Sequence, residues 1–261
     1  MNTMERVKPA ATVSQAYFAS QYSIHNLCEN IAQKDFSFIS SRKMASLLSA
    51  IEPSTAEEWS EFQQSWNRLE QDMFMRDGGS YRFRRHATYS VVPGATTAQL
   101  ESHQPHYQSL DYNTLNGGIA RDFAPIEPII SQNKVFTAVI ELCCTLFGRL
   151  APFFAWHVEV HQFRINASQS EVSPTPEGVH RDGVNFVFMM MVNRVNIVSG
   201  ETTIYDRTKR PLSKYTLADE MEAAIVNDEQ VMHGVTPIIQ LDPQSPAFRD
   251  VLVITFKKTL N

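Results

Sequence analysis

The chain has 261 residues, a net charge of −5 and a hydrophobic share of 43 % that includes 16 phenylalanines. This composition is sufficient for a sizeable core, and the length lies within the range of an elaborated all-β barrel. No basic stripe recurs along the sequence, which argues against a nucleic-acid partner. No apolar run approaches the length of a membrane span, and no apolar segment follows the first residues, so we expect no membrane association.

The cysteines indicate a reducing compartment. Cys28, Cys143 and Cys144 are odd in number and do not have zinc-finger spacing. Neighbouring cysteines rarely pair with each other, so we interpret all three as reduced core thiols of a cytoplasmic protein. The sequence does not fix the oligomeric state and leaves a homo-oligomer open.

In chain order, the N-terminal part is mainly helical. Apolar residues recur at helical spacing over 14–31 and 40–51, and a third helix starts near residues 53–58 and runs to about residue 69. Residues 34–39 alternate like an early strand. We expect one domain over 1–261, in which residues 1–75 form a mostly helical support that begins with a loose tail at 1–10.

The remainder, over residues 80–257, is rich in β-strand patterns. Strand character recurs at 81–89, 155–165, 185–192, 201–206, 211–217, 223–226 and 249–256, with Ser199-Gly200 as a hairpin-like turn. One amphipathic helix, over 134–149, interrupts them. Because strands and helices do not alternate, the pattern argues against a doubly wound fold and predicts a mainly β protein with flanking helices.

The segment 105–125 is long, polar and rich in turn residues. Long loops in compact domains are often functional lids. We therefore expect this segment to close over a polar substrate, with Tyr107, Gln108 and Arg121 as substrate-binding candidates. Turn chemistry alone explains its Gly and Asn residues equally well.

Three arginines lie within four positions of the strand-like segment 81–89. Arg82, Arg84 and Arg85 have the charge to bind an anion. The alternative is that they are solvated or paired on an outer face of the protein. The sequence favours the second interpretation.

The segment Gly178-Val179-His180-Arg181-Asp182-Gly183 precedes an apolar strand-like run. In a strand, residues i and i+2 point to the same face, so His180 and Asp182 are expected to converge. His233, in a second strand-like segment, is the candidate third ligand. Two histidines and one carboxylate on one face, with the opposite positions open, suit non-heme Fe(II) oxygenases.

A rival ligand set lies in the segment 155–165. His157, Glu159 and His161 share one face of that strand but lack flanking glycines. Gln162 and Arg164 lie on the opposite face, and we expect one of them to line the pocket. For His180 and Asp182, the alternative is a chance H-x-D triplet, and for His233 a hydrogen-bonded structural histidine.

Arg249 begins the final strand, sixteen positions beyond His233. A guanidinium is a planar fork that binds a carboxylate through two hydrogen bonds. Arg249 is therefore the candidate partner for the far carboxylate of a dicarboxylic acid.

Together these segments resemble the 2-oxoglutarate/Fe(II)-dependent dioxygenase family of bacterial free amino-acid hydroxylases, which includes isoleucine 4-hydroxylases. The resemblance rests on the box at 178–183, the segments 199–206 and 233–238, and the closing strand 249–256, and it covers roughly residues 70–257. It implies a double-stranded β-helix, the jelly-roll or cupin-like core. It further implies Fe(II) held by His180, Asp182 and His233, with 2-oxoglutarate as cosubstrate and O2 as oxidant.

The same resemblance assigns roles to other residues. It implies that Arg249 binds the distal carboxylate of 2-oxoglutarate, with Thr255 as a weaker second anchor and Arg164 as a weaker one still. It implies a free aliphatic amino acid such as Ile, Leu or Met as substrate, without fixing which one. In related halogenases a small residue replaces the carboxylate ligand, so the presence of Asp182 favours hydroxylation, or sulfoxidation of a thioether.

Three alternatives remain open at this point. The same chemistry suits another small acid or a carrier-bound amino acid. A His/Asp/His site also suits Zn(II) in a hydrolase or a cupin-like isomerase, a function that would not require Arg249. The third alternative is a binding module with a vestigial metal site.

Overall fold

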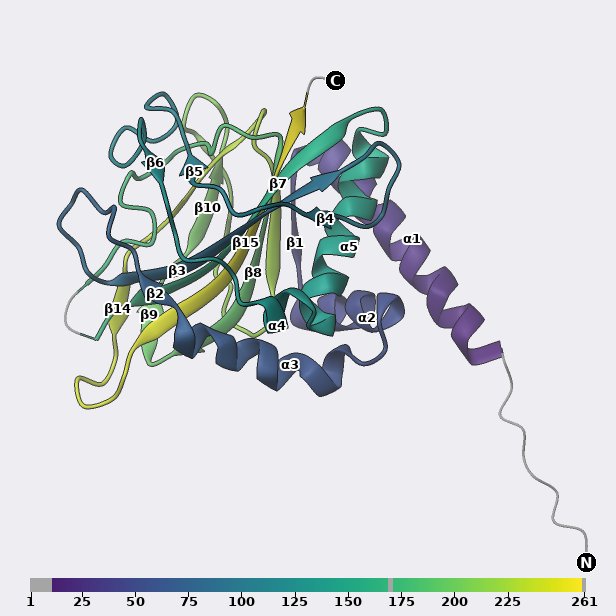
Figure 1. Ribbon diagram of the computed structural model, residues 1–261, viewed down its shortest axis with the longest axis horizontal. Helices are drawn as coiled ribbons and strands as arrows, with labels where there is room; N and C mark the ends of the chain where they lie inside the picture. Colours follow the sequence, from purple (N-terminus) through teal and green to yellow (C-terminus); the bar gives the residue numbers. More distant parts are fainter. Residues whose placement is uncertain (1–10, 169–170, 260–261) are drawn as a thin grey trace, which may run out of the picture.

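In the computed structural model, which describes residues 11–168 and 171–259, helices cover one face of a large antiparallel sheet (Figure 1). The strands of this sheet follow the order β1-β12-β8-β15-β7-β3-β2, and β4 pairs with β3. Their bounds are β1 Phe36–Ile39, β2 Glu70–Gln71, β3 Arg82–Val91, β4 Gln99–Leu100, β7 Ala155–Asn166, β8 Phe186–Val195, β12 Ala223–Asn227 and β15 Phe248–Thr259.

The remaining described strands form three smaller sheets. The sheet β11-β10-β13 is accompanied by the pairs β14-β9 and β5-β6. Their bounds are β5 His106–Tyr107, β6 Ala120–Arg121, β9 Ile197–Ser199, β10 Thr202–Tyr205, β11 Pro211–Tyr215, β13 Met232–Val235 and β14 Ile238–Gln240. The predicted mainly β fold with a jelly-roll core is confirmed.

The predicted hairpin at Ser199-Gly200 is wrong. The strand β9 before the turn pairs with β14, whereas β10 after it pairs with β11 and β13. Both turn residues have positive φ, 66° and 75°. The turn therefore transfers the chain from one sheet to another.

Four of the helices pack together against the large sheet. The helices are α1 Ala11–Lys34, α2 Ser41–Ile51, α3 Thr55–Gln64, a 3-10 helix at Ser65–Arg68, α4 Pro128–Ser131 and α5 Lys134–Leu150. Helix α5 is the centre of this layer, since α1, α2 and α3 all contact it. The side chain of Asn133 caps its first turn by accepting from the backbone N–H groups of Val135 and Phe136.

The helical prediction for the N-terminal part agrees with α1 to α3, while the predicted tail at 1–10 lies outside the described residues. Within the described part of the chain, no helix is both long and apolar enough to cross a membrane. The three cysteines carry no disulfide, and Cys143 and Cys144 are buried.

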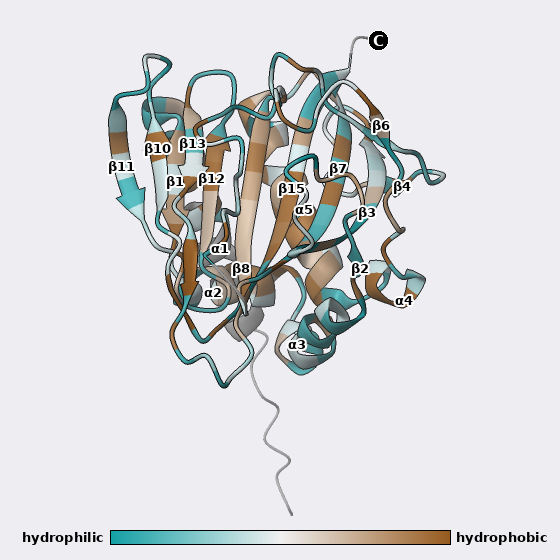
Figure 2. Cartoon of the chain, turned by 90° about the vertical axis from the view of Figure 1, so that its left-hand side faces the viewer, coloured by the Kyte–Doolittle hydropathy of each residue, from teal (hydrophilic) through white to brown (hydrophobic). Residues whose placement is uncertain are grey.

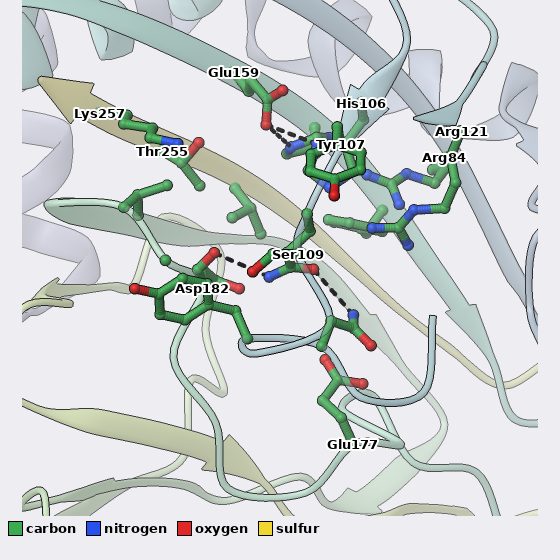
Figure 3. A pocket seen from close by; sticks show the side chains of 18 of the residues that line it. Arg84, His106, Tyr107, Ser109, Arg121, Glu159, Glu177, Asp182, Thr255 and Lys257 are labelled. Carbon is green, nitrogen blue, oxygen red and sulfur yellow. Dashed lines mark hydrogen bonds and ion pairs between the residues drawn. The ribbon is translucent and has the colours of Figure 1, made fainter. Parts of the chain in front are cut away.

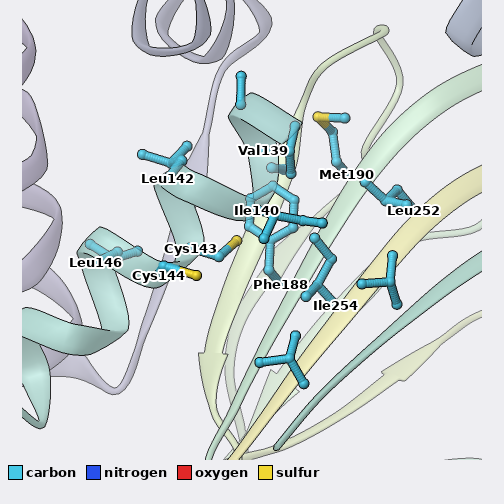
Figure 4. Close-up of a cluster of buried hydrophobic side chains, with 14 of the residues drawn as sticks. Val139, Ile140, Leu142, Cys143, Cys144, Leu146, Phe188, Met190, Leu252 and Ile254 are labelled. Atoms are coloured by element: carbon cyan, nitrogen blue, oxygen red, sulfur yellow. The ribbon is translucent and has the colours of Figure 1, made fainter. Parts of the chain in front are cut away.

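The main core lies between α5 and the sheet (Figure 4). Alternate residues of the central strands point into it, among them Phe188 and Met190 of β8 and Leu252 and Ile254 of β15. The intervening residues of the same strands point to the other face, as period-two alternation requires. These strands are largely hydrophobic along their length, whereas the connecting loops are mainly hydrophilic (Figure 2). The second face of the sheet therefore carries the candidate site.

Candidate active site

Three side chains converge at the entrance to β8. His180 Nε2 lies 3.5 Å from Asp182 Oδ1, and His233 Nε2 lies 3.6 Å from Asp182 Oδ2. One possible ligand atom from each residue falls within 4.8 Å of the others. These separations exceed a hydrogen bond but suit atoms that share one metal ion. The structure thus brings together the three residues predicted from the sequence.

The route by which they converge differs from the prediction. His180 and Asp182 lie before β8 and not within a strand, so strand alternation does not align them. His180 is joined to His233 of β13 by two backbone hydrogen bonds of 3.0 Å. The buried Asp228 carboxylate then accepts from the N–H groups of Asp182, Gly183 and Val184 at 2.9, 2.9 and 3.2 Å. A backbone bridge and a buried carboxylate therefore fix the segment 178–184, called the ligand loop below because it carries His180 and Asp182.

Asp228 was not predicted from the sequence, because nothing in a short turn distinguishes it from a solvated acid. Burial and the nearby charge of Asp182 raise the pKa of Asp228 to about 7. Its three N–H donors favour the ionised form, which can accept from all of them.

The hydrogen bonds of the two histidines fit metal binding. His180 Nδ1 lies 2.9 Å from the carbonyl oxygen of Gly178. Because a carbonyl only accepts, Nδ1 carries a proton, and Nε2 is the nitrogen that is left to bind a metal. His233 Nδ1 is buried and has no hydrogen-bond partner among the described residues.

Burial disfavours the charged forms of His180, Asp182 and His233, and the neighbouring groups determine the direction in which each pKa shifts. For His180, the Asp182 carboxylate outweighs burial and raises the pKa to about 9. For Asp182, the hydrogen bond from His180 and the charges of both histidines outweigh burial and lower the pKa. For His233, burial and the charge of His180 lower the pKa to about 4. Asp182 and His233 are therefore already in the protonation states that a metal requires.

Arg249 lines the same small cavity as the three candidate ligands. This cavity has a volume of about 130 Å³, and Val187, Met189, Val251 and Val253 supply apolar walls. Arg249 is buried, its Nε has no hydrogen-bond partner, and the described residues offer it no ion pair. Burial lowers its pKa to about 10, so the guanidinium remains charged at neutral pH. A buried cation without a partner fits a cavity that receives a carboxylate.

Thr255 and Arg164, the two weaker candidates for binding 2-oxoglutarate, do not line the cavity that contains Arg249. Thr255 lies six residues beyond Arg249 on β15, a separation of roughly 20 Å along a strand, and it lines a different cavity. Arg164 binds Asp250 through two hydrogen bonds of 2.7 Å each, on the opposite face of β7. Gln162 is also on that face, where it donates to Ser65. The expectation that Gln162 or Arg164 lines the pocket is therefore wrong.

A second cavity of about 230 Å³ adjoins the first (Figure 3). Asp182 lines both cavities, so a molecule in the larger one lies beside the candidate metal site. All three predicted substrate-binding residues, Tyr107, Gln108 and Arg121, line the larger cavity. The volume is below the roughly 300–1,000 Å³ of pockets for drug-sized ligands, which indicates a small molecule.

The segment 105–125 forms one wall of this cavity. The short strands β5 and β6 pair within it, and Gln108 donates a hydrogen bond of 3.0 Å to the carbonyl oxygen of Asp182. The ring of Tyr112 lies against Gly183, where an added Cβ would come within 2.4 Å of it. The segment thus lies directly on the ligand loop.

The rival ligand set belongs to a larger cluster on the wall of the second cavity. His157, Glu159 and His161 do share a face, and Glu159 and His161 meet His86 and His106 there. Glu159 Oε2 lies 2.7 Å from His106 Nδ1. Burial opposes the charge of Glu159, but hydrogen bonds from the surrounding histidines outweigh it and lower the pKa.

One contact argues against a metal ion in this cluster. Arg84 Nη2 lies 2.7 Å from His161 Nδ1, and a guanidinium can only donate. Burial and the charge of Arg84 lower the pKa of His161, so the ring is neutral and its single proton lies on Nε2. The proton on His161 Nε2 faces Glu159 and Arg84 occupies Nδ1, so neither ring nitrogen offers a lone pair to a metal. At His180 the Gly178 carbonyl holds only the Nδ1 proton, and Nε2 can give up its proton when a metal binds. The cluster at His180 is the better metal site.

Comparison with known proteins identifies the family of the chain. The family model described as 2OG-Fe dioxygenase matches residues 63–255. A 3(1)-hydroxy-L-isoleucine 4-dioxygenase from Pantoea ananatis (strain AJ13355) is 26 % identical over 159 residues, which cover 59 % of this chain and 64 % of that protein. An L-isoleucine-4-hydroxylase from Bacillus thuringiensis is 24 % identical over 201 residues, or 74 % of this chain and 80 % of that protein. The match to the Pantoea protein thus spans slightly less than two thirds of its length.

Solved structures show the same fold. A BsmA homologue from Methylobium petroleophilum PM1 is 30 % identical, with a TM-score of 0.79 over 90 % of this chain and 92 % of that one. The IDO protein from Bacillus thuringiensis is 20 % identical, with a TM-score of 0.76 over 91 % of this chain and all of that one.

Proposed function

The chain belongs to the 2OG-Fe dioxygenase family, and on that premise we propose that it hydroxylates an unactivated C–H bond of a free L-amino acid. The substrate has an aliphatic side chain of the Ile, Leu or Met kind. The reaction uses Fe(II), 2-oxoglutarate and O2. The two curated relatives, both named for action on isoleucine or its hydroxylated form, support this substrate class.

One observation carries the proposal. The convergent residues His180, Asp182 and His233 share a cavity with Arg249, a buried cation to which the described residues offer no ion pair. A Zn(II) hydrolase would use the three ligands but would have no need of this cation. An Fe(II) site that takes a dicarboxylic keto acid uses all four residues.

Each residue has a distinct task in this proposal. The three ligands hold Fe(II) from one side, and Arg249 binds the distal carboxylate of 2-oxoglutarate through charge-assisted hydrogen bonds. When bound, the metal and keto acid supply the oxidation, in which O2 is consumed, succinate and CO2 are released, and one oxygen enters the substrate. The apolar residues Val251 and Val253 limit water in the keto-acid cavity.

The chain otherwise acts by positioning. A substrate in the larger cavity lies next to Asp182, and the segment 105–125 covers it. Holding the reacting bond close to the metal is the main contribution that such a site makes to the rate. The free cysteines fit the cytoplasmic location that we propose for the enzyme.

The proposal is tested by reconstituting the protein with Fe(II) without oxygen, then adding 2-oxoglutarate, O2 and each of the twenty amino acids. Mass spectrometry is expected to detect succinate together with a product heavier by one oxygen atom for at least one aliphatic amino acid. Asp182→Ala is expected to abolish both products, whereas Asp206→Ala, at an exposed turn, retains them. Turnover that persists with Zn(II) in place of Fe(II), or without 2-oxoglutarate, would contradict the proposal.

A further inference from the structure

Three guanidinium groups lie on the wall of the larger cavity, beyond what the proposed iron and keto-acid sites require. Arg82 and Arg84 come from β3 and Arg121 from β6, and all three are buried. Their partner in the described structure is the carboxylate of Asp72, which lies 2.7 Å from Arg82 Nε and 3.7 Å from Arg84 Nη1. One carboxylate thus serves two of the three arginines, and Arg121 has no ion pair among the described residues.

The arginines also retain hydrogen-bond donors without acceptors. The buried atoms Arg82 Nη2, Arg84 Nε and Arg121 Nε have no hydrogen-bond partner in the described structure. Burial opposes the charged form of Arg121, and the charge of Arg82 adds to this effect, so its pKa is lowered. Buried cations with unused donors are costly unless an anion enters to bind them.

Stacking holds two of the three groups in place. The Arg84 guanidinium carbon lies 3.6 Å from the centre of the Phe123 ring, and that of Arg121 lies 5.6 Å from the same centre. A second ring, Phe163, lies 4.4 Å from Arg84. Figure 3 shows both arginines directed into the cavity from the same wall. Two guanidiniums fixed over one aromatic ring are already oriented to bind a planar anion.

The charges nearby determine the kind of anion. Glu159 and Glu177 also line the cavity, so a large anion with several charges would meet two carboxylates as well as the arginines. A small molecule with a single carboxylate meets less repulsion from these two acids than an anion with several charges does. The volume of about 230 Å³ suits a molecule of this size.

We propose, on the basis of the proposed function, that Arg84 and Arg121 bind the α-carboxylate of the substrate and make a free carboxylate obligatory. The substrate is then a free amino acid. An amino acid held as a carrier thioester, or within a peptide chain, is excluded because its carbonyl carries no negative charge for the two cations to bind. Arg121 is the specificity-determining residue, since Arg84 already contacts His161 and Asp72.

The test compares acids with their uncharged amides. Protein loaded with Fe(II) and 2-oxoglutarate, without oxygen, is titrated by calorimetry with L-isoleucine, L-leucine and L-methionine and with the primary amide of each. At least one acid is expected to bind, and its amide to bind about tenfold or more weakly, because a charge-assisted interaction is lost. Equal binding of acid and amide, or no binding by any of the three acids, would overturn the inference.

Variants identify the responsible residue. In Arg121→Gln, the affinity for the acid is expected to fall to that for its amide, while the affinity for the amide stays nearly unchanged. Arg121→Lys is expected to restore part of the difference between the two affinities. The matched control is Arg85→Gln, since Arg85 follows Arg84 on β3 but binds the carbonyl oxygens of Arg68 and Pro125. Circular dichroism confirms that each variant is folded. Discrimination that survives in Arg121→Gln would overturn the assignment.

A titration of 2-oxoglutarate into each protein separates the two proposals. If 2-oxoglutarate binds normally but acids and amides bind equally well, the proposed carboxylate site is refuted and the proposed function is not. Failure of 2-oxoglutarate to bind the wild-type protein refutes the proposed function, and the comparison of acids with amides in the same samples still decides the carboxylate site.

Discussion

His180 Nδ1 lies 2.9 Å from the carbonyl oxygen of Gly178, only two residues earlier in the chain. This contact sets which nitrogen of the ring faces the metal position. Gly178 adopts a φ of +77°, and a Cβ built there would meet nothing within 4 Å. An alanine at this position would therefore strain the backbone without causing a clash.

Gly178→Ala is expected to destabilise the fold by roughly 1–2 kcal/mol, the cost of a left-handed residue that carries a Cβ. Because the carbonyl would shift, Fe(II) affinity is expected to fall on the order of 10–100-fold. Gly94→Ala is the matched control, with the same φ of +77° and open space around the Cβ, in a turn after β3. Urea unfolding and metal titration measure the two effects. Equal metal affinity in both variants would show that the carbonyl does not orient His180.

Asp228→Asn tests the support of the ligand loop. In the wild-type protein, each carboxylate oxygen of Asp228 accepts from a backbone N–H group of the loop. An asparagine keeps one oxygen as an acceptor, but its NH2 group would replace the other and place a donor against a donor. We expect the affinity for Fe(II) to fall by about 10–100-fold. Competition with a chelator under anaerobic conditions measures the change. Asp206→Asn, at an exposed turn where the carboxylate also accepts backbone N–H groups, is expected to leave metal affinity unchanged.

Arg249→Gln tests the keto-acid site. Losing the partner of a buried carboxylate costs about 2–5 kcal/mol, so the KM for 2-oxoglutarate is expected to rise by roughly 30-fold or more. Steady-state kinetics with varied 2-oxoglutarate measure this rise. Arg194→Gln is the control, because Arg194 pairs with Arg249 in the β-ladder but donates to the carbonyl oxygen of Ser199. An unchanged KM in Arg249→Gln would transfer the role to Arg82, which lines both cavities.

Asp72 is predicted to stabilise the fold in a pH-dependent way. Burial opposes its ionisation, but the charges of Arg82 and Arg84 outweigh burial and lower the pKa of Asp72. Because its pKa is lower in the folded state, its contribution to stability is fully present above about pH 4 and is lost as the pH falls further. Asp72→Asn is expected to cost about 3–5 kcal/mol at pH 7.

Urea unfolding between pH 3 and pH 7 measures this contribution. The free energy of unfolding of the wild-type protein is expected to fall more steeply below pH 4 than that of Asp72→Asn. Asp122→Asn is the control, since the Asp122 side chain is 74 % exposed in its contact with His103. Parallel pH profiles for wild type and Asp72→Asn would show that the pair does not contribute.

The sequence identified the residues of the candidate metal site but not the structure that aligns them. Flanking glycines, a distant His-Gly pair and Arg249 beyond it favoured His180, Asp182 and His233 over the rival set, and the family resemblance implied the same three ligands. The assumed strand geometry was wrong, because the alignment depends on a backbone bridge to β13 and on Asp228. Such support comes from residues distant in the chain, whose proximity no local pattern reveals.

The arginines of β3 show what strand alternation can and cannot decide. Strand alternation places Arg84 and Arg85 on opposite faces of β3, but it does not identify the face that lines the cavity. The expectation of an outer, paired face holds for Arg85 alone, whereas Arg82 and Arg84 face inward. The partner that makes this burial tolerable, Asp72, lies ten residues before Arg82 in a segment without a distinctive pattern.

The hydrogen bond from Gln108 to the carbonyl oxygen of Asp182 joins the segment that lines the substrate cavity to a candidate iron ligand. Such coupling is reciprocal: a ligand that stabilises the observed position of segment 105–125 is expected to favour the bound metal by the same free energy. Iron is therefore expected to dissociate fastest from protein without substrate, and a bound amino acid is expected to slow its loss during storage.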